Sequence, residues 1–131
     1  MTADGDYPLV ENSADGLGVR VPTDIRPDEQ DRVRPAIPKK RKGDGMSITP
    51  SDPKRMPNAR RPKTLENGQS DRPLWRIDSA VLGLELRFRP DRVPAPTHGV
   101  IEPAHEMQLT EYRAALAATR TQWVLVLGGS D

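Results

Sequence analysis

The 131-residue chain contains no cysteine, which excludes disulfides, thiolate metal sites and cysteine nucleophiles. It has no basic segment followed by an apolar one near its start, so we expect no secretory signal peptide. No apolar run approaches the roughly 20 residues that a membrane-spanning helix needs, and we expect no membrane partner. These absences predict a protein that acts in the cytoplasm, and they leave open export by a route without a cleavable signal.

The chain is also poor in hydrophobic residues (34%) and in aromatic residues (4%), while it has 14 prolines and 10 glycines. Much of the backbone must therefore form loops, and the core must be small. Lys and Arg total 20 against 19 for Asp and Glu, a balance that does not demand a polyanionic partner. We expect a single domain over 1–131, with a polar, loop-rich N-terminal part over 1–44.

One helix is clear toward the C-terminus. Residues spaced by three and four positions form its apolar face: Leu109, Tyr112, Leu116, Thr119 and Trp123. The intervening alanines favour a helix, and Arg113 and Arg120 are expected to point to solvent. Either Gln108 or Thr110 is expected to cap its start.

Short strands are predicted around the helix, with turns and prolines between them. The predicted segments are 16–22, 45–49, 73–78, 84–89, 99–102 and 123–127. In 84–89, alternation places Leu84, Leu86 and Phe88 toward the core. The apolar segment 123–127 is expected to form a final buried strand. The predicted fold class is α+β, with a small split or twisted β-sheet, one C-terminal-region helix and long proline-rich loops.

Chemistry-bearing residues are few, and the standard phosphate-binding and hydrolase motifs are absent. His98 and His105 are separated by seven positions and a proline, a spacing that does not favour a metal site, so we expect no metal. An imidazole at His98 can bind a ribose hydroxyl or can cap a strand end, and both interpretations stay open. Ser47 and Glu102 are similarly ambiguous.

Two basic regions are candidate nucleic-acid contacts. The cluster Lys39, Lys40, Arg41 and Lys42 is similar to a nuclear-localisation signal, but a solvated loop explains it as well. The proline-rich loop 50–68 is basic but has no aromatic residue on which a base could stack. We therefore do not expect a nucleic-acid partner.

Four segments together carry a family resemblance. They are G-M-S-I at 45–48, P-L-W-R-I-D at 73–78, T-H-G-V-I-E-P-A-H-E-M at 97–107, and a helix of pattern E-Y-x-x-A-L-x-x-T-R-x-x-W. This arrangement resembles the NAD-dependent toxins that bacteria export by type VI secretion. The resemblance implies an ADP-ribosyltransferase-like split sheet, with its core over 45–127.

The resemblance also implies a site. Gly45, Met46 and Ser47 match the family's G-[TS]-S segment, and Thr97 and His98 match its Thr-His pair, so these residues are expected to bind NAD. Ser47 and His98 would line the NAD cleft, with His98 holding the ribose on the nicotinamide side. NAD would be a substrate used without a metal, a cognate immunity protein would be the partner, and the target would be intracellular.

Glu102 has no counterpart in the family motif. We expect it to face the NAD cleft and to stabilise the oxocarbenium-like charge that develops as the nicotinamide bond breaks, which would make it catalytic beside His98 and Ser47. The chain departs from the family pattern at Met46 and lacks the family's apolar-aromatic-arginine first strand. The alternatives are therefore a degenerate, inactive copy of the toxin or a non-enzymatic interaction module.

Overall fold

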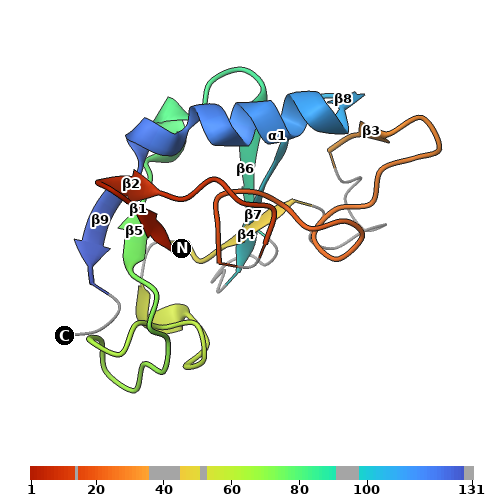
Figure 1. Ribbon diagram of the computed structural model, residues 1–131. Helices are drawn as coiled ribbons and strands as arrows, with labels where there is room; N and C mark the ends of the chain where they lie inside the picture. Colours follow the sequence, from red (N-terminus) through yellow and green to blue (C-terminus); the bar gives the residue numbers. More distant parts are fainter. Residues whose placement is uncertain (14, 36–44, 51–52, 91–97, 129–131) are drawn as a thin grey trace.

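The computed structural model describes the whole chain except residues 14, 36–44, 51–52, 91–97 and 129–131. Within the described residues, one α-helix lies above a central three-stranded sheet, with smaller two-stranded pairs around it (Figure 1). All pairs of named strands are antiparallel. This arrangement confirms the predicted α+β class with a split sheet.

The described strands are β1 (Ala3–Asp4), β2 (Tyr7–Pro8), β3 (Arg32–Val33), β4 (Met46–Ile48), β5 (Leu74–Arg76), β6 (Leu86–Pro90), β7 (Gly99–Pro103), β8 (Met107–Gln108) and β9 (Val124–Leu127). The helices are η1 (Pro53–Arg55), η2 (Ser79–Val81), α1 (Leu109–Ala118) and η3 (Arg120–Gln122). The central sheet has the order β4-β7-β6, and the pairs are β1-β2, β3-β8 and β5-β9.

The two faces of the central sheet differ in chemistry. Its residues follow the two-residue alternation of β-strands, so partners across the register share a face. The apolar row Met46, Ile101 and Phe88 belongs to the hydrophobic cluster that includes α1. The opposite face carries the row Ser47, Val100 and Arg89. The sheet thus presents a second, mostly polar face that does not belong to this cluster.

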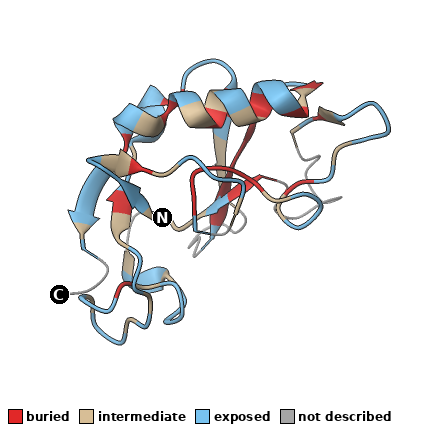
Figure 2. Cartoon of the chain, viewed as in Figure 1, coloured by how far each residue is buried: buried red, intermediate tan, exposed pale blue. Residues whose placement is uncertain are grey.

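Helix α1 packs as its periodicity predicts. Leu109, Tyr112 and Leu116 are buried on its inner face, and Thr119 and Trp123 continue this buried face beyond its end (Figure 2). At its start, the Glu111 carboxylate accepts a hydrogen bond from the Gln108 backbone N–H (3.4 Å), so Gln108 is the capping position.

The N-terminal part contributes more to the core than its polar composition suggests. Leu17, Val19, Ile25 and Val33 are each at most 1% exposed and join the same hydrophobic cluster as α1. The predicted strand over 16–22 does not form, because this segment pairs with a neighbour at a single bridge, between Val10 and Leu17. The side chains alternate into the core without a continuous hydrogen-bonded ladder.

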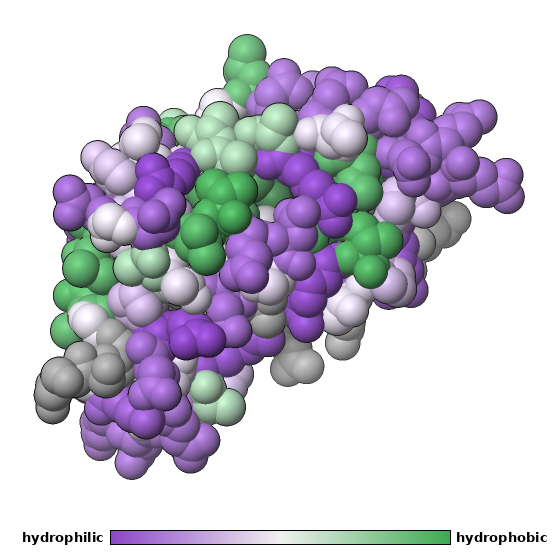
Figure 3. All heavy atoms as spheres, in the orientation of Figure 1, coloured by the Kyte–Doolittle hydropathy of each residue, from purple (hydrophilic) through white to green (hydrophobic). Residues whose placement is uncertain are grey.

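Three details of the prediction are wrong. The segment 123–127 does form a strand, but β9 is largely exposed, with Leu125 53% exposed, and green side chains mark its place at the left of the molecule (Figure 3). Leu84 is 90% exposed because β6 begins only at Leu86. Neither of the two helix arginines points to solvent. Arg113 donates from Nη2 to the Val19 carbonyl oxygen (3.2 Å), and Arg120 donates to the carbonyl oxygens of Pro8 and Asp4.

Among the described residues, no helix combines the length and apolar character required to cross a membrane.

Candidate functional site

The polar face of the central sheet brings the sequence-predicted site residues together. Ser47 lies opposite Val100 in the register between β4 and β7, and Glu102 is two positions further along β7 on the same face. His98 immediately precedes β7, and strand alternation places its position on that face as well. Ser47, His98 and Glu102 therefore belong to one side of one sheet, although the chain separates Ser47 from the others.

Gly45 begins the segment that carries Ser47. Its φ of +148° lies in a region that L-residues rarely adopt, and a Cβ atom there would lie 2.7 Å from the Ile101 carbonyl oxygen. Its N–H donates to the Asp24 carbonyl oxygen (2.7 Å). Glycine is thus required for β4 to approach β7 at this point, which explains the residue without reference to a ligand.

Met46 and Tyr112 fix the same segment from the core side. The Met46 side chain is buried in the hydrophobic cluster, so only its backbone belongs to the polar face. The Met46 N–H donates to the Tyr112 hydroxyl (3.1 Å), and that hydroxyl donates to the Ile101 carbonyl oxygen. A single buried phenol on α1 therefore joins β4 to β7 beside Ser47.

Ser47 and His98 are both exposed to solvent. An exposed hydroxyl and an exposed imidazole on one face can each exchange a hydrogen bond with a bound ligand. Thr97, the remaining residue predicted to bind NAD, lies outside the described residues, as do Lys39, Lys40, Arg41 and Lys42.

Glu102 has a different environment from the expected one. Its side chain is fully buried at 0% exposure. Arg87 donates from Nε (3.1 Å) and Nη2 (2.8 Å) to one carboxylate oxygen, and Arg89 donates from Nε (3.2 Å) to the other. A buried carboxylate is stable only when it is paired and hydrogen-bonded, and the two arginines meet that requirement. These contacts favour a positioning role, and direct contact between Glu102 and a reacting sugar stays a prediction.

The alternation of 84–89 places Arg87 and Arg89 on the face opposite the apolar side chains, but it does not connect them with Glu102. The sequence signal for this pairing is the alternation of arginines in L-R-F-R together with a glutamate, Glu102, in the following strand. The pairing could not be predicted, because the register Arg87 to Glu102 depends on which strands are neighbours.

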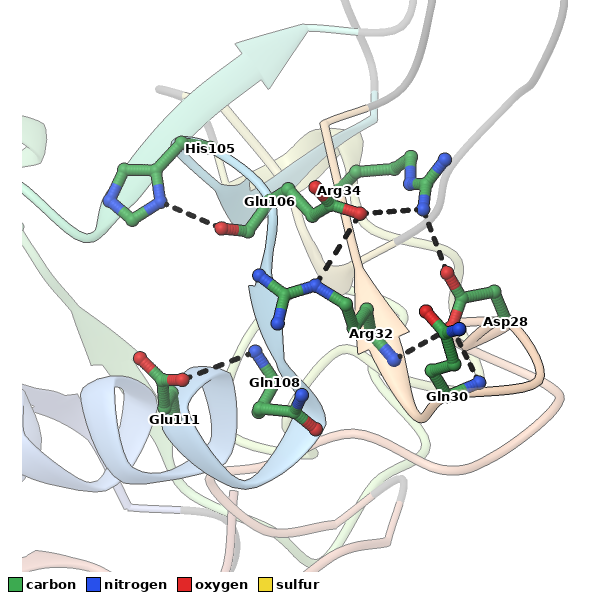
Figure 4. A network of polar contacts seen from close by, with 8 residues as sticks. All are labelled: Asp28, Gln30, Arg32, Arg34, His105, Glu106, Gln108 and Glu111. Carbon is green, nitrogen blue, oxygen red and sulfur yellow. Dashed lines mark hydrogen bonds and ion pairs between the residues drawn. The ribbon is translucent and has the colours of Figure 1, made fainter.

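A second polar network includes Glu106, with His105 at its edge, and joins β3 to β8 (Figure 4). Glu106 pairs with Arg34 (2.7 Å) and Arg32 (3.4 Å), while Arg34 also pairs with Asp28 (2.7 Å). His105 lies 3.3 Å from the Glu85 carboxylate. These side chains are largely exposed, and their contacts hold the segment that leads into α1.

Asp28 organises the turn at one end of this network. Its carboxylate accepts hydrogen bonds from the N–H groups of Arg32 (3.0 Å) and Gln30 (2.9 Å), and these bonds hold its pKa below the ordinary value of 3.8. The arrangement is a turn motif closed by a side chain, which accounts for the cluster structurally.

Across the described portion of the chain, no group of three or more His, Cys, Asp or Glu side chains could hold a metal ion. The site consists instead of an exposed hydroxyl, an exposed imidazole and an arginine pair held by one carboxylate.

Comparison with known proteins identifies a family. A family model described as Tse2 ADP-ribosyltransferase toxin matches residues 4–123. No curated protein and no solved structure matches. The matched range includes the whole central sheet, helix α1 and every residue of the polar face described above.

Proposed function

Because the chain belongs to the Tse2 ADP-ribosyltransferase toxin family, we propose that it is a toxin domain that cleaves the bond between nicotinamide and ribose in NAD and transfers ADP-ribose to an intracellular target. The observation that carries this proposal is the common face of Ser47 and His98. Both side chains are exposed there, on a sheet that lies wholly inside the family match.

The reaction requires the protein to bind NAD and to stabilise the charge that develops on the sugar. The bond between ribose C1′ and the nicotinamide nitrogen breaks, and its electron pair neutralises the departing pyridinium ring. The sugar develops oxocarbenium-like positive charge, as in glycoside hydrolysis. A nucleophilic atom of the acceptor then bonds to C1′ and loses its proton, so the product is an ADP-ribosylated target.

The side chains on the polar face suit these steps. His98 would hydrogen-bond a hydroxyl of the nicotinamide-side ribose, and Ser47 would bind the same part of NAD from β4. Gly45 and the Tyr112 hydroxyl hold β4 against β7 beside Ser47, and this supports a site that is organised before substrate binds. Glu102 would act in this site through the arginines that it holds.

The proposed partner and the proposed place of action rest on the family, not on contacts observed in this chain. A toxin of this kind, delivered by type VI secretion, would act in the cytoplasm of the target cell, and its producer would hold it inactive with a cognate immunity protein. NAD would be consumed as a substrate, and the proposal assigns no metal to the reaction.

The test is NAD consumption by the purified chain, compared with His98→Ala and Ser47→Ala. The matched control is His105→Ala, which removes the chain's other histidine from the network of β8. We expect His98→Ala to lower NAD consumption by at least about tenfold, the usual scale for losing a group that binds the reacting part of a substrate, and His105→Ala to retain it. Equal turnover by wild type and His98→Ala would remove His98 from the site, and absence of any turnover by the wild type would overturn the transferase proposal.

One observation favours a non-enzymatic interaction module as the second candidate. The β9 side chains Val124, Leu125 and Val126 are all exposed, although they are apolar. Contiguous exposed apolar side chains are a common feature of docking surfaces. A chain that binds no NAD but forms a stable complex that Leu125→Lys disrupts would favour this candidate.

A further inference from the structure

We propose that Arg87 binds the diphosphate of NAD and that Glu102 is the positioning residue that holds it ready. This inference rests on the proposed function, because it assigns a subsite of the same polar face. It begins from the alternation of β6, which puts Arg87 and Arg89 on the face that carries Ser47.

The two arginines differ in exposure although they share one carboxylate. Glu102 is fully buried, the Arg89 side chain is 21% exposed and the Arg87 side chain is 52% exposed. Arg89 therefore lies mainly within the protein, whereas Arg87 extends from the buried carboxylate toward solvent. Of the two arginines on this carboxylate, Arg87 therefore presents the accessible positive charge.

The contacts of Arg87 leave part of its guanidinium group available. A guanidinium has five N–H donors in a planar fork. Arg87 uses Nε and Nη2 on one oxygen of Glu102 (3.1 and 2.8 Å). The remaining donors lie on the half-exposed side chain, in the fork geometry that binds phosphate oxygens in pairs.

Glu102 makes this arginine a better anion ligand than a free surface arginine. A long, flexible side chain loses rotamer entropy when a ligand immobilises it. Arg87 has already lost much of that freedom, because two hydrogen bonds tie it to a carboxylate that cannot move within the sheet. Phosphate binding therefore costs less in entropy than it would at an untethered arginine.

The position also fits one molecule that contacts Ser47 and Arg87. Ser47 and Arg87 lie two residues apart along the sheet and two strands apart across it, with β7 between them, so their backbones are about 12 Å apart. The long arginine side chain can cover part of this distance, and a ribose and its 5′-diphosphate bridge the remainder. The nicotinamide-side ribose would lie beside Ser47 and His98, and the diphosphate would extend along β6 to Arg87.

The experiment measures ligand binding by isothermal titration calorimetry together with KM and kcat for NAD. Wild type is compared with Arg87→Gln and with the control Arg76→Gln, which removes an exposed arginine from β5. The probes are NAD, ADP-ribose and nicotinamide riboside, which has no phosphate. We expect Arg87→Gln to weaken NAD and ADP-ribose binding about tenfold or more, the usual effect of losing a hydrogen bond to a charged group. Nicotinamide riboside binding should not change, and the NAD effect should fall on KM and not on kcat.

Arg87→Gln removes one partner of the buried Glu102 carboxylate, and this loss alone could unfold the protein. A second variant keeps the test valid in that case. The double variant Arg87→Gln/Glu102→Gln removes the buried negative charge as well, and it should fold and show the same selective loss of ADP-ribose. A folded variant of either kind that binds ADP-ribose as tightly as wild type would overturn the subsite and leave the proposed function standing. A wild-type chain that binds neither NAD nor ADP-ribose would overturn both, whereas ADP-ribose binding without turnover would support the subsite alone.

Discussion

Gly45 shows how a residue that matches a functional motif can have a structural cause. Its φ is +148°, and a Cβ atom at this position would contact the backbone of β7. The sequence predicted Gly45 as part of a cofactor-binding segment. The structure supplies a separate reason for glycine, because β4 could not otherwise approach β7 and bring Ser47 level with Val100.

Replacing Gly45 with alanine is expected to destabilise the fold by about 1–3 kcal/mol, since strain and a steric clash coincide there. The control is Gly83→Ala, where φ is +80° but nothing lies within 4 Å of the added Cβ. Urea unfolding of both variants separates strain from clash. A smaller loss at Gly45 than at Gly83 would show that β4 shifts easily to accommodate the methyl group.

Asp28 provides a pH prediction. Its folded pKa lies below the ordinary 3.8 because the Arg32 and Gln30 N–H groups donate to the carboxylate. A lowered folded pKa means that the unfolded chain binds the proton more readily. The resulting stability is present above about pH 4 and is lost as pH falls through the lower, folded value.

Asp28→Asn should therefore show a shallower decline of melting temperature between about pH 4 and pH 2 than wild type, because the amide does not titrate. Thermal melts followed by circular dichroism across this range measure the difference. Glu29→Gln, an exposed neighbour, controls for removing one negative charge from the same turn. Parallel curves for Asp28→Asn and wild type would contradict the linkage.

At the scale of single residues, the family pattern identified two exposed positions but not the partners of the buried one. Ser47 and His98 were identified from a family pattern, and both prove to be exposed. Glu102 was expected to face a ligand, yet it is buried between Arg87 and Arg89. Its partners lie on another strand, and a sequence does not specify which strands become neighbours.

At the scale of elements, α1 was predictable because its periodicity identifies the buried face without reference to any other element. Strand β9 shows the limit of this reasoning. An apolar run predicts a strand, but burial depends on whether another layer covers it. In the described residues β9 pairs only with β5, and its side chains stay largely exposed.

Two leucines test this contrast. Leu116→Ala should cost about 2–5 kcal/mol, because the side chain is fully buried on α1 and its loss leaves a cavity. Leu125→Ala should cost no more than about 1 kcal/mol, since roughly half of that side chain is already exposed. Chemical denaturation of the two variants gives the comparison directly. Equal losses would mean that β9 is covered in solution, for instance by a second copy of the chain.

At the scale of the whole molecule, the hydrophobic cluster includes residues from both parts of the chain that the sequence distinguishes. The segment 45–127 was predicted to hold the core, and 1–44 to be a polar, loop-rich part. Four side chains from the first part are buried in the same hydrophobic cluster as α1: Leu17, Val19, Ile25 and Val33. Leu17 and Val19 belong to the predicted strand segment 16–22, whereas Ile25 and Val33 are isolated among polar residues, without a periodic run to identify an element. The cluster therefore joins both parts of the chain.

A fragment covering 45–131 is consequently expected not to fold by itself. Burial of the four side chains contributes about 6–12 kcal/mol, at about 1.5–3 kcal/mol each. That is comparable with the whole stability of a small domain, about 5–15 kcal/mol. The fragment also loses β3, which pairs with β8 immediately before α1, and the Asp24 carbonyl oxygen that accepts the Gly45 N–H. Proton NMR dispersion and urea melts of the fragment and of the full chain measure this dependence. Cooperative unfolding of the fragment would show that β4, β6, β7 and α1 hold together without the N-terminal part. A proton NMR spectrum without dispersion would show that the polar face of the sheet forms only when the N-terminal part completes the core.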